Sequence, residues 1–511
     1  MEQRSIKVSP PRLAAEHLGF FRWGRIAGKV LVTNDAGDWA FLTDPEFKDL
    51  LAGAIADGHP RFQELQHKGF LRDGMDVDAL AARVSRRNHH VRRGPHLHIV
   101  VLTLRCNMTC AYCQVSRETA DKEGVDMTPE TAEKVVDLAL QSSSPAITFE
   151  FQGGEPLLNF DVLRHLVEVG RVRGERAGKA VTFSLVSNFT AMTEERAEWL
   201  IANDVLVCTS LDGPASVHDV NRKWKHGSAY AEVVKWIDYF NRRYIEMGRD
   251  PRLWHIDALM TTTRRTIQSW REVIDEYVAR DMRTIHLRPL NPSGFAREAW
   301  QLVGYTAEEY LEFYRQALDY IIELNRKGVE IMERTASIFL IKILTSDDPG
   351  FVDIQSPCGA GTGQVAYNFD GRVFPCDEAR MVDAMGDNLF ALGHVRDLTI
   401  PDMLRHPTVR AIASASLLDA QPMCSECWNK PFCGVCPVYN FVTQQDLFGQ
   451  RTRSFQCKEH MFVTERLFEL LADESDTEIA QILERWTIMR PRLDDDGSAL
   501  ADGGRAMKEA P

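Results

Sequence analysis

The sequence contains no hydrophobic run long enough to cross a membrane. Among its 511 residues, no apolar stretch reaches the roughly 18 residues that a spanning helix needs. The N-terminus, MEQRSIKVSPPR, has no apolar segment of the kind found in signal peptides. We therefore expect a cytoplasmic protein without a membrane partner, in a compartment where thiols stay reduced.

An excess of positive charge is also absent. The formal net charge is −13 at pH 7, which argues against nucleic acid or an anionic lipid surface as the main partner. The composition, 44% hydrophobic and 26% charged, is that of an ordinary globular protein. A chain of this length exceeds one hydrophobic core, and typical domain sizes suggest about three or four domains.

Eleven cysteines need an explanation, because disulfides are rare in a reducing compartment. Cys208 stands alone in VLVCTS, and we expect it to be a buried structural thiol in a strand. The other ten form two groups, three between residues 106 and 113 and seven between residues 358 and 457. Both groups predict metal ligands.

From residue 98 onward, β-type and α-type segments alternate. Helical patterns separate the β-type segments, as in TPETAEKVVDLALQ, where Thr128 is the expected N-cap and Pro129 the first helical residue. Six such units predict a parallel sheet with helices outside it, either an open sheet or a partial barrel. The predicted strands are residues 98–104, 146–152, 181–187, 205–211, 254–260 and 284–290.

The first ninety residues contain no cluster of metal-type ligands. KVLVTNDAGDWAFL (29–42) predicts a β-hairpin, and the segments 44–55 and 60–71 predict two short amphipathic helices, which together form a winged-helix-like module. RVSRRNHHVRRGPH (83–96) is basic and aperiodic, which predicts a linker or a solvated surface segment. At the other end, RLDDDGSALADGGRAMKEAP (492–511) is acidic and poor in aromatics, which predicts disorder.

The first cysteine group lacks the fourth ligand of a closed metal site. Cys106, Cys110 and Cys113 have the spacing C-x3-C-x2-C directly after the first predicted strand, at the strand end where α/β folds collect their chemistry. A structural zinc ion takes four protein ligands, so three thiols would leave it short. In a 4Fe–4S cluster, three thiolates leave one iron open for a substrate or a cofactor.

RCNMTCAYC resembles the signature of the radical S-adenosylmethionine (SAM) enzymes. In that family the open iron chelates the amino and carboxylate groups of SAM. An electron from the cluster then cleaves the sulfonium to a 5′-deoxyadenosyl radical, which abstracts a substrate hydrogen. The resemblance implies a partial (β/α)6 TIM-type barrel, a SAM-binding 4Fe–4S cluster on the three cysteines, and a cofactor role for Tyr112.

Further segments resemble the SAM-side motifs of the same family. They are GGEP after the second strand, LVSNFT after the third, and SLDGPASVHDVNR, which resembles a block in peptide- and protein-modifying members. The glycines of GGEP would let the main chain approach the SAM amino group, with an ordinary turn as the alternative. The Arg222 guanidinium suits the SAM carboxylate, with a surface salt bridge as the alternative. The implied cofactor residues are Tyr112, Gly153, Gly154, Glu155, Pro156, Ser187, Asn188, Arg222 and Leu290, with Arg288 beside the last.

The seven downstream cysteines resemble the SPASM extension of radical SAM maturases, which carries two auxiliary 4Fe–4S clusters. Their spacing reads C-x12-G-x4-C and C-x2-C-x5-C-x2-C, followed by one more cysteine, and the last pair departs from the x3 spacing usual in the family. Two zinc sites are the alternative, but seven ligands do not make two closed four-cysteine sites. By analogy, one cluster takes Cys424, Cys427, Cys433 and Cys457, and the other takes only Cys358, Cys376 and Cys436.

SPASM members mostly modify ribosomally made peptides or protein side chains. The N-terminal module resembles their precursor-recognition element, which adds a leader peptide as a strand to a sheet edge. GRIAGKVLVTNDAGDWAFL together with CAYCQVSR resembles the maturases of the His-Xaa-Ser peptide system. The resemblance implies three partners: a precursor peptide with a leader, a reductant such as flavodoxin or ferredoxin, and a second radical SAM maturase of the same system.

Two other functions stay open at this point. One is a sulfatase-type maturase that forms formylglycine, because in FPCDE Asp377 follows a cluster cysteine, as the general base does in those enzymes. The other is a non-catalytic iron–sulfur carrier or DNA-binding protein. In either maturase reading, Asp377 is the predicted catalytic carboxylate, acting as a base or as a ligand of the open iron.

The motifs predict five regions. They are a winged-helix-like leader-recognition module (1–90), a radical SAM partial barrel (91–300), a helical bridge (301–350), a SPASM auxiliary-cluster domain (351–465), and a C-terminal helix with a disordered acidic tail (466–511).

Overall fold

The computed structural model describes residues 16–115, 117–251 and 254–488, together with three short backbone segments beyond them. Those segments are β18 (Arg492–Leu493), β19 (Ala499–Ala501) and β20 (Arg505–Ala506), which pair with one another. The rest of the tail predicted to be disordered lies outside the described residues. Within the described part of the chain, no helix has the length and apolar character needed to cross a membrane.

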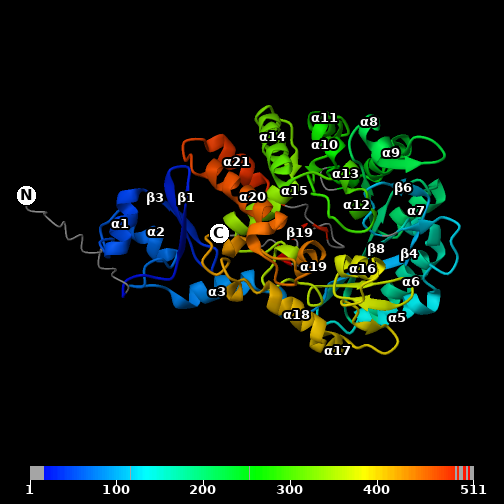
Figure 1. Ribbon diagram of the computed structural model, residues 1–511, viewed down its shortest axis with the longest axis horizontal. Helices are drawn as coiled ribbons and strands as arrows, with labels where there is room; N and C mark the ends of the chain where they lie inside the picture. Colours follow the sequence, from blue (N-terminus) through cyan, green and yellow to red (C-terminus); the bar gives the residue numbers. More distant parts are fainter. Residues whose placement is uncertain are drawn as a thin grey trace, which may run out of the picture.

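The largest sheet among the described residues has eight strands in the order β12-β10-β9-β8-β4-β15-β16-β17. Its strands β4 and β8 lie toward the side of the molecule opposite the N-terminus (Figure 1). Its first five strands are mutually parallel and neighbours in sequence order. This arrangement confirms the predicted α/β fold with a partial barrel. These strands are β4 (Leu97–Thr103), β8 (Ala146–Gly153), β9 (Ala180–Ser187), β10 (Val205–Ser210) and β12 (Asp257–Leu259).

Helices connect the parallel strands and cover their outer face. Thr128 caps the first of these helices by accepting a hydrogen bond from the main-chain N–H of Thr131, and Pro129 begins it, as predicted. The connecting helices are α5 (Pro129–Ala139), α6 (Phe160–Arg176), α7 (Glu194–Ala202), α8 (Ala215–Asn221), α9 (Ala229–Glu246), α10 (Arg264–Gln268) and α11 (Trp270–Ala279).

The sixth predicted strand is mostly unpaired. Only β13 (Thr284–Ile285) forms a ladder, and its partner is β14 (Met332–Glu333) rather than β12. Beyond it, side chains satisfy the main chain: Leu287 donates its N–H to Glu333 Oε1 at 3.1 Å and accepts from the Tyr310 hydroxyl at 2.7 Å. The segment after β13 is therefore extended without being part of the sheet.

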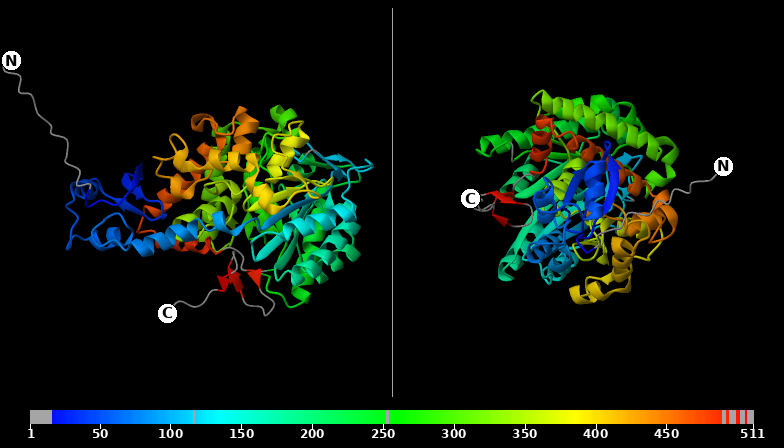
Figure 2. Two further views of the ribbon diagram at one scale, coloured as in Figure 1. Left: turned by 90° about the horizontal axis from the view of Figure 1, so that it is seen from below. Right: turned by 90° about the vertical axis from the view of Figure 1, so that its left-hand side faces the viewer.

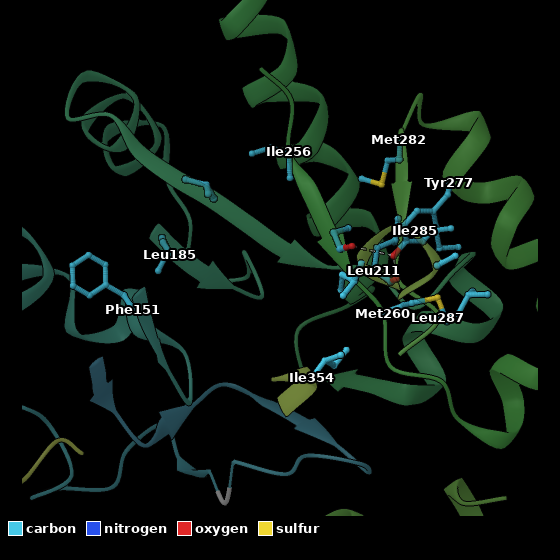
Figure 3. Packing of buried hydrophobic residues seen from close by; sticks show 14 of the residues in the cluster. Phe151, Leu185, Leu211, Ile256, Met260, Tyr277, Met282, Ile285, Leu287 and Ile354 are labelled. Carbon is cyan, nitrogen blue, oxygen red and sulfur yellow. Dashed lines mark hydrogen bonds between the residues drawn. The ribbon is translucent and has the colours of Figure 1, made fainter. Parts of the chain in front are cut away.

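The hydrophobic core runs along the inner side of these helices. Figure 3 shows Leu211, Tyr277 and Ile285 packed together beneath the end of the barrel, and the Tyr277 hydroxyl donates to the Leu211 carbonyl at 2.7 Å. The same contiguous core extends to Ile26 and Phe41 near the N-terminus.

The cysteine-rich region joins the barrel through the free edge of β4. Strand β15 (Gln364–Tyr367) pairs parallel with β4, and β16 (Arg372–Phe374) and β17 (Gly393–His394) continue the sheet antiparallel. The helices of this half are α12 (Phe295–Glu298), α13 (Trp300–Val303), α14 (Ala307–Arg326), α15 (Arg334–Leu344), α16 (Asp377–Ala384), α17 (Ile400–Arg405), α18 (Pro407–Ser416), α19 (Pro437–Gln444), α20 (Phe455–Leu471) and α21 (Thr477–Arg485).

An N-terminal module lies at one end of the molecule, and α5–α7 lie at the other (Figure 2). We use this name for β1–β3 and α1–α3, residues 22–87. The predicted hairpin is present, and a strand that was not predicted, β1, pairs with it. The elements are β1 (Arg22–Ile26), β2 (Lys29–Thr33), β3 (Trp39–Leu42), α1 (Asp44–Ala52), α2 (Phe62–His67) and α3 (Val77–Arg87).

The prediction of an aperiodic linker at 83–96 is wrong. The end of α3 and the short helix α4 (His90–Arg93) occupy most of it. Arg87 is buried, and its guanidinium donates to the carbonyls of Lys342 and Pro431, both at 2.8 Å. A basic residue therefore ties distant segments together here instead of facing solvent.

Candidate functional site

The cysteine loop, residues 105–114, follows the C-terminal end of β4. Short ladders hold it in place: β5 (Arg105–Cys106) pairs with β7 (Glu118–Thr119), and β6 (Met108–Cys110) pairs with β11 (Arg222–Trp224). In the second ladder Cys110 is the direct partner of Arg222. The loop is thus positioned by main-chain hydrogen bonds as well as by its own side chains.

The two glycines at the end of β8 allow a close approach between main chains. A Cβ on Gly153, whose φ is +129°, would lie 2.3 Å from the Thr103 carbonyl oxygen, and one on Gly154 would lie 2.2 Å from that of Arg105. Gly154 donates its N–H to Thr103 at 2.9 Å. The glycines are therefore required by the base of the cysteine loop, which the sequence did not reveal, and both also line the cavity described below.

Glu155 braces the ends of two strands. It is fully buried, and its carboxylate accepts from Ser187 Oγ at 2.8 Å and from the Asn188 N–H at 2.8 Å. Burial raises the pKa of this carboxyl, and the hydrogen bonds partly oppose the rise. Glu155 and the following Pro156 do not line the cavity, whereas Ser187 and Asn188 do.

Asn188 lies beside the cysteine loop. Its Nδ2 group donates to Cys106 Sγ at 3.7 Å and to Asn107 Oδ1 at 3.3 Å. Thr190 donates to the same Asn107 oxygen at 2.9 Å. This network orients the first cysteine of the loop, and it includes two residues, Asn107 and Thr190, that the motifs did not single out.

Arg222 is a cavity-wall residue and not part of a surface salt bridge. Its side chain is 11% exposed, and Nε donates to Asp212 Oδ2 at 3.1 Å. Burial alone would lower the pKa of Arg222, but the Asp212 carboxylate outweighs it, and the pKa rises. The guanidinium therefore stays protonated and presents its positive charge to the cavity, as binding of a ligand carboxylate requires.

The sixth β–α unit supplies two further wall residues. Leu290 is buried, and its main-chain N–H donates to the Tyr305 hydroxyl at 2.7 Å. Arg288 Nη2 lies 3.9 Å from Glu378 Oε1. Both residues line the cavity, as their proposed cofactor roles require.

The three thiols of the cysteine loop fit a positively charged iron–sulfur group. Burial raises the pKa of Cys106, and that of Cys110 to about 12, and neighbouring thiolates of the loop add to both shifts. Thiols of this kind bind as thiolates only when a metal centre compensates their charge. Cys106, Cys110 and Cys113 all lie on the cavity wall.

The downstream cysteines separate into the two predicted sets. Cys433 has Cys424, Cys427 and Cys457 as its charged neighbours, which, after burial, raise its pKa further. In the same way, burial raises the pKa of Cys436, and the charge of the neighbouring Cys358 raises it further. We call the first set the four-cysteine group (Cys424, Cys427, Cys433 and Cys457) and the second the three-cysteine group (Cys358, Cys376 and Cys436).

Two other observations bear on the ligands. Among the described residues, no set of three or more His, Cys, Asp or Glu side chains is arranged to hold a single metal ion. Cys208 was expected to be buried in a strand. It does lie in β10, but it points to the inner side of the barrel and is half-buried on the cavity wall.

Asp377 lies at the start of α16, directly after Cys376. It is buried, and its Oδ1 accepts from Arg380 Nε at 2.7 Å. The neighbouring Glu378 and the distant Asp353 are the carboxylates whose charge acts on the thiols of the three-cysteine group. Sequence spacing alone pointed to Asp377 and could not have identified Asp353.

One cavity of about 2050 Å³ joins most of these residues. Its wall includes the cysteine loop, the SAM-side residues from β8, β9 and β11, the three-cysteine group and Asp377. The four-cysteine group is not on this wall. The structure therefore brings together every predicted site residue except that group, Glu155 and Pro156.

Comparisons with known proteins agree with this arrangement. The family profile described as the radical SAM superfamily matches residues 100–249, and the SPASM iron–sulfur cluster-binding domain matches residues 358–428. A cysteine-type anaerobic sulfatase-maturating enzyme of Clostridium perfringens is 25% identical over 308 residues, which cover 58% of this chain and 76% of that protein.

Two solved structures share the fold. The structure described as native anSMEcpe with bound AdoMet superposes with a TM-score of 0.59 at 20% identity, covering 76% of this chain and 100% of the other. Streptococcus suis SuiB bound to the precursor peptide SuiA superposes with a TM-score of 0.50 at 12% identity, covering 86% and 99%. The chain therefore carries a radical SAM domain followed by a SPASM iron–sulfur cluster-binding domain, which supports S-adenosylmethionine and iron–sulfur clusters as its cofactors.

Proposed function

We propose that this enzyme is a maturase that modifies a ribosomally made precursor peptide of the His-Xaa-Ser type. The observation that carries the proposal is the cavity whose wall includes both the cysteine loop and the three-cysteine group. At about 2050 Å³, it exceeds the roughly 300–1000 Å³ of ordinary small-molecule sites. It has room for a peptide segment in addition to the cofactor.

The residues of the chain divide the work within this cavity. When bound, SAM and its cluster supply radical chemistry at a substrate C–H bond. The cysteine loop holds the cluster, Arg222 holds the SAM carboxylate, and Ser187 and Asn188 border the same ligand. Asp377 lies on the wall of the same cavity, where we propose that it removes a substrate proton or closes the open iron of the three-cysteine group.

The N-terminal module offers one free strand edge for a leader peptide. The outward carbonyls of β3 are already used, since Trp39 accepts from Lys68 Nζ and Phe41 from Arg61 Nη2, both at 2.8 Å. On β1, the two-residue turn at 27–28 directs the main-chain groups of Trp23 and Arg25 outward.

No described main-chain group pairs with these outward positions of β1. The side chain of Trp23 is 53% exposed beside them. We propose that the leader adds as a strand along β1, with its side chains against this surface.

A proline substitution in β1 tests the proposed leader site. Arg25→Pro removes an outward N–H without removing a β1–β2 hydrogen bond, so it should weaken leader binding at least ~10-fold while the sheet stays paired. Arg61→Ala, which changes the β3 edge instead, is the matched control and should have little effect. The probe is a fluorescently labelled precursor peptide that carries a leader and His-Xaa-Ser repeats, and its binding is measured by anisotropy. Equal affinity for the parent and Arg25→Pro would exclude the β1 edge.

A second candidate is sulfatase maturation, favoured by the names of several relatives that are 22–25% identical to this chain. One assay distinguishes sulfatase maturation from modification of a His-Xaa-Ser precursor. The holoenzyme, SAM and a chemical reductant are incubated with a Cys/Ser-x-Pro-x-Arg peptide or with a leader-containing His-Xaa-Ser peptide. Mass spectrometry of each peptide is compared with 5′-deoxyadenosine formed. Formylglycine in the first peptide alone would overturn the His-Xaa-Ser proposal.

The remaining partners are also proposals. A flavodoxin- or ferredoxin-type reductant would supply the electron, and a second radical SAM maturase would act on the same precursor.

A further inference from the structure

Asp212 is the centre of a buried network that the SAM-side motifs do not explain. Its side chain is fully buried, in the loop after β10. Oδ2 accepts from the Tyr112 hydroxyl at 2.6 Å and from Arg222 Nε at 3.1 Å. The Arg222 guanidinium carbon lies 5.2 Å from the centre of the Tyr112 ring. One carboxylate oxygen thus connects the cysteine loop to the strand that carries Arg222.

The surroundings fix this carboxylate in place. The Asp212 N–H donates to His218 Nδ1 at 3.2 Å, and Thr261 donates its N–H to Asp212 Oδ1 at 3.4 Å. Burial lowers the pKa of His218 to about 4, so the imidazole is neutral and can accept this hydrogen bond. The loop therefore has no freedom to turn the carboxylate away from Arg222.

The geometry of Arg222 shows what this arrangement leaves available. Its Nε is the atom used by Asp212, and no described protein group accepts from either terminal nitrogen. The two terminal nitrogens form the planar fork that matches a carboxylate. The opposing ladder residue of Arg222 is Cys110, so the fork lies next to the cysteine loop.

We infer that Asp212 is a positioning residue of the cofactor site. It holds the Arg222 fork and the Tyr112 ring of the cysteine loop in one rigid unit, so that a ligand carboxylate is received beside the open iron. This inference rests on the proposed role of Arg222 toward SAM. It predicts that Asp212 contributes to the binding of the amino-acid part of SAM and not to that of its nucleoside part.

The test compares two ligands on the reconstituted holoenzyme by anaerobic equilibrium dialysis. SAM carries the carboxylate, and 5′-methylthioadenosine shares the nucleoside but lacks it. Asp212→Asn keeps the size and removes the charge, and it should weaken SAM binding on the order of 10- to 100-fold, as for other residues that orient a ligand-binding group. Binding of 5′-methylthioadenosine should change less than ~3-fold. An equal loss for both ligands, or no loss for SAM, would overturn the inference.

Two companion variants separate the possible failures. Arg222→Gln should lose SAM affinity to the same extent, and the double variant should be no weaker than Arg222→Gln alone, because the two residues act as one unit. If Arg222→Gln leaves SAM binding unchanged, the proposed role of Arg222 fails. If Arg222→Gln weakens SAM binding and Asp212→Asn does not, only the role of Asp212 fails.

The matched control is Glu333→Gln. Glu333 is another fully buried carboxylate that accepts from a tyrosine hydroxyl, Tyr314, at 2.6 Å, but it does not line the cavity. It should lower thermal stability without changing the ratio of the two affinities. Iron content and circular dichroism confirm that each variant is folded and loaded before the comparison is made.

Discussion

The two downstream cysteine groups have the same chemistry but different neighbours. The three-cysteine group lines the cavity and lies near the carboxylates of Glu378 and Asp353. The four-cysteine group is away from the cavity wall and packs against the N-terminal module. Ligand type alone therefore does not determine the task of such a site. One group therefore lies on the cavity wall, and the other lies beside the contacts that hold the module to the rest of the chain.

The contacts of the four-cysteine group support this division. The segment 425–431, which contains Cys427, shares four hydrogen bonds or ion pairs with the module, of which it accepts three and donates one. Thr33 Oγ1 donates to the Trp428 carbonyl at 2.7 Å, and Lys430 Nζ donates to Asp35 at 2.8 Å. The other two donors are the guanidinium groups of Arg22 and Arg87, which bond to the carbonyls of Ser425 and Pro431.

The largest effect is expected from the cysteine loop, which serves as the reference for both groups. Replacing Cys106, Cys110 and Cys113 together by Ala should abolish reductive formation of 5′-deoxyadenosine, because no thiolate remains to hold the SAM-binding cluster. Iron on the downstream groups should remain, which iron analysis and electron paramagnetic resonance would measure. SAM cleavage by this variant would contradict the assignment.

A large loss of stability is expected from Arg87→Ala. The side chain is buried and donates to the carbonyls of Lys342 and Pro431, so its removal leaves buried acceptors without partners. We expect the free energy of unfolding to fall by about 3 kcal/mol, from roughly 1–3 kcal/mol for each unsatisfied group. Chemical denaturation measures it.

The control for Arg87→Ala is the adjacent Arg86→Ala. Arg86 is exposed on the same helix, and its replacement should change stability by less than ~0.5 kcal/mol. If both variants lose the same stability, the buried contacts of Arg87 are not the cause. If neither variant loses stability, the contacts of Arg87 do not anchor the module.

Local patterns predicted much of what surrounds these groups. Thr128 and Pro129 predicted the start of α5, and Thr306 begins α14 with a capping box inside the predicted helical bridge. The position of the cysteine loop followed from the strand before it. In each case the cause lies within a few residues of the feature, so a local reading of the sequence is enough.

Features that depend on distant partners were missed. The segment RWGRI of β1 has a central glycine and two arginines, and its pairing with β2 gives it a strand identity that its composition does not. Arg87 reads as solvated because its acceptors lie more than 250 residues away. Asp212 stood inside a recognised block without an assigned role, since only the fold brings Tyr112 to it.

At the three-cysteine group, Asp377→Asn should separate cofactor cleavage from product formation. If Asp377 acts on the substrate or on the open iron, coupled product should fall at least ~10-fold while 5′-deoxyadenosine continues to form. Glu378→Gln removes the charge of the neighbouring carboxylate. An equal loss of product in both variants would mean that the negative charge near the group matters, and a loss in Asp377→Asn alone would mean that the position of Asp377 matters. Unchanged product and 5′-deoxyadenosine with Asp377→Asn would mean that another group closes the site.

The smallest effect is expected from Thr33→Val, which tests the link between the module and the four-cysteine group with a near-isosteric change. Thr33 is fully buried and gives one hydrogen bond to Trp428. Its loss should lower the free energy of unfolding by about 1 kcal/mol. Because Trp428 directly follows Cys427, a chelator should remove iron from the four-cysteine group about 5-fold faster, the factor that ~1 kcal/mol represents.

The control is Thr209→Val, another fully buried threonine, whose hydroxyl donates to the Ser187 carbonyl at 2.9 Å in the barrel, away from the module and the four-cysteine group. It should lose similar stability without faster iron release. The three-cysteine group has no contact with Thr33 among the described hydrogen bonds, so its iron should be released at the parent rate in both variants. Faster release from both groups in Thr33→Val would mean that the two groups respond together to general destabilisation, and the contrast between them would not hold.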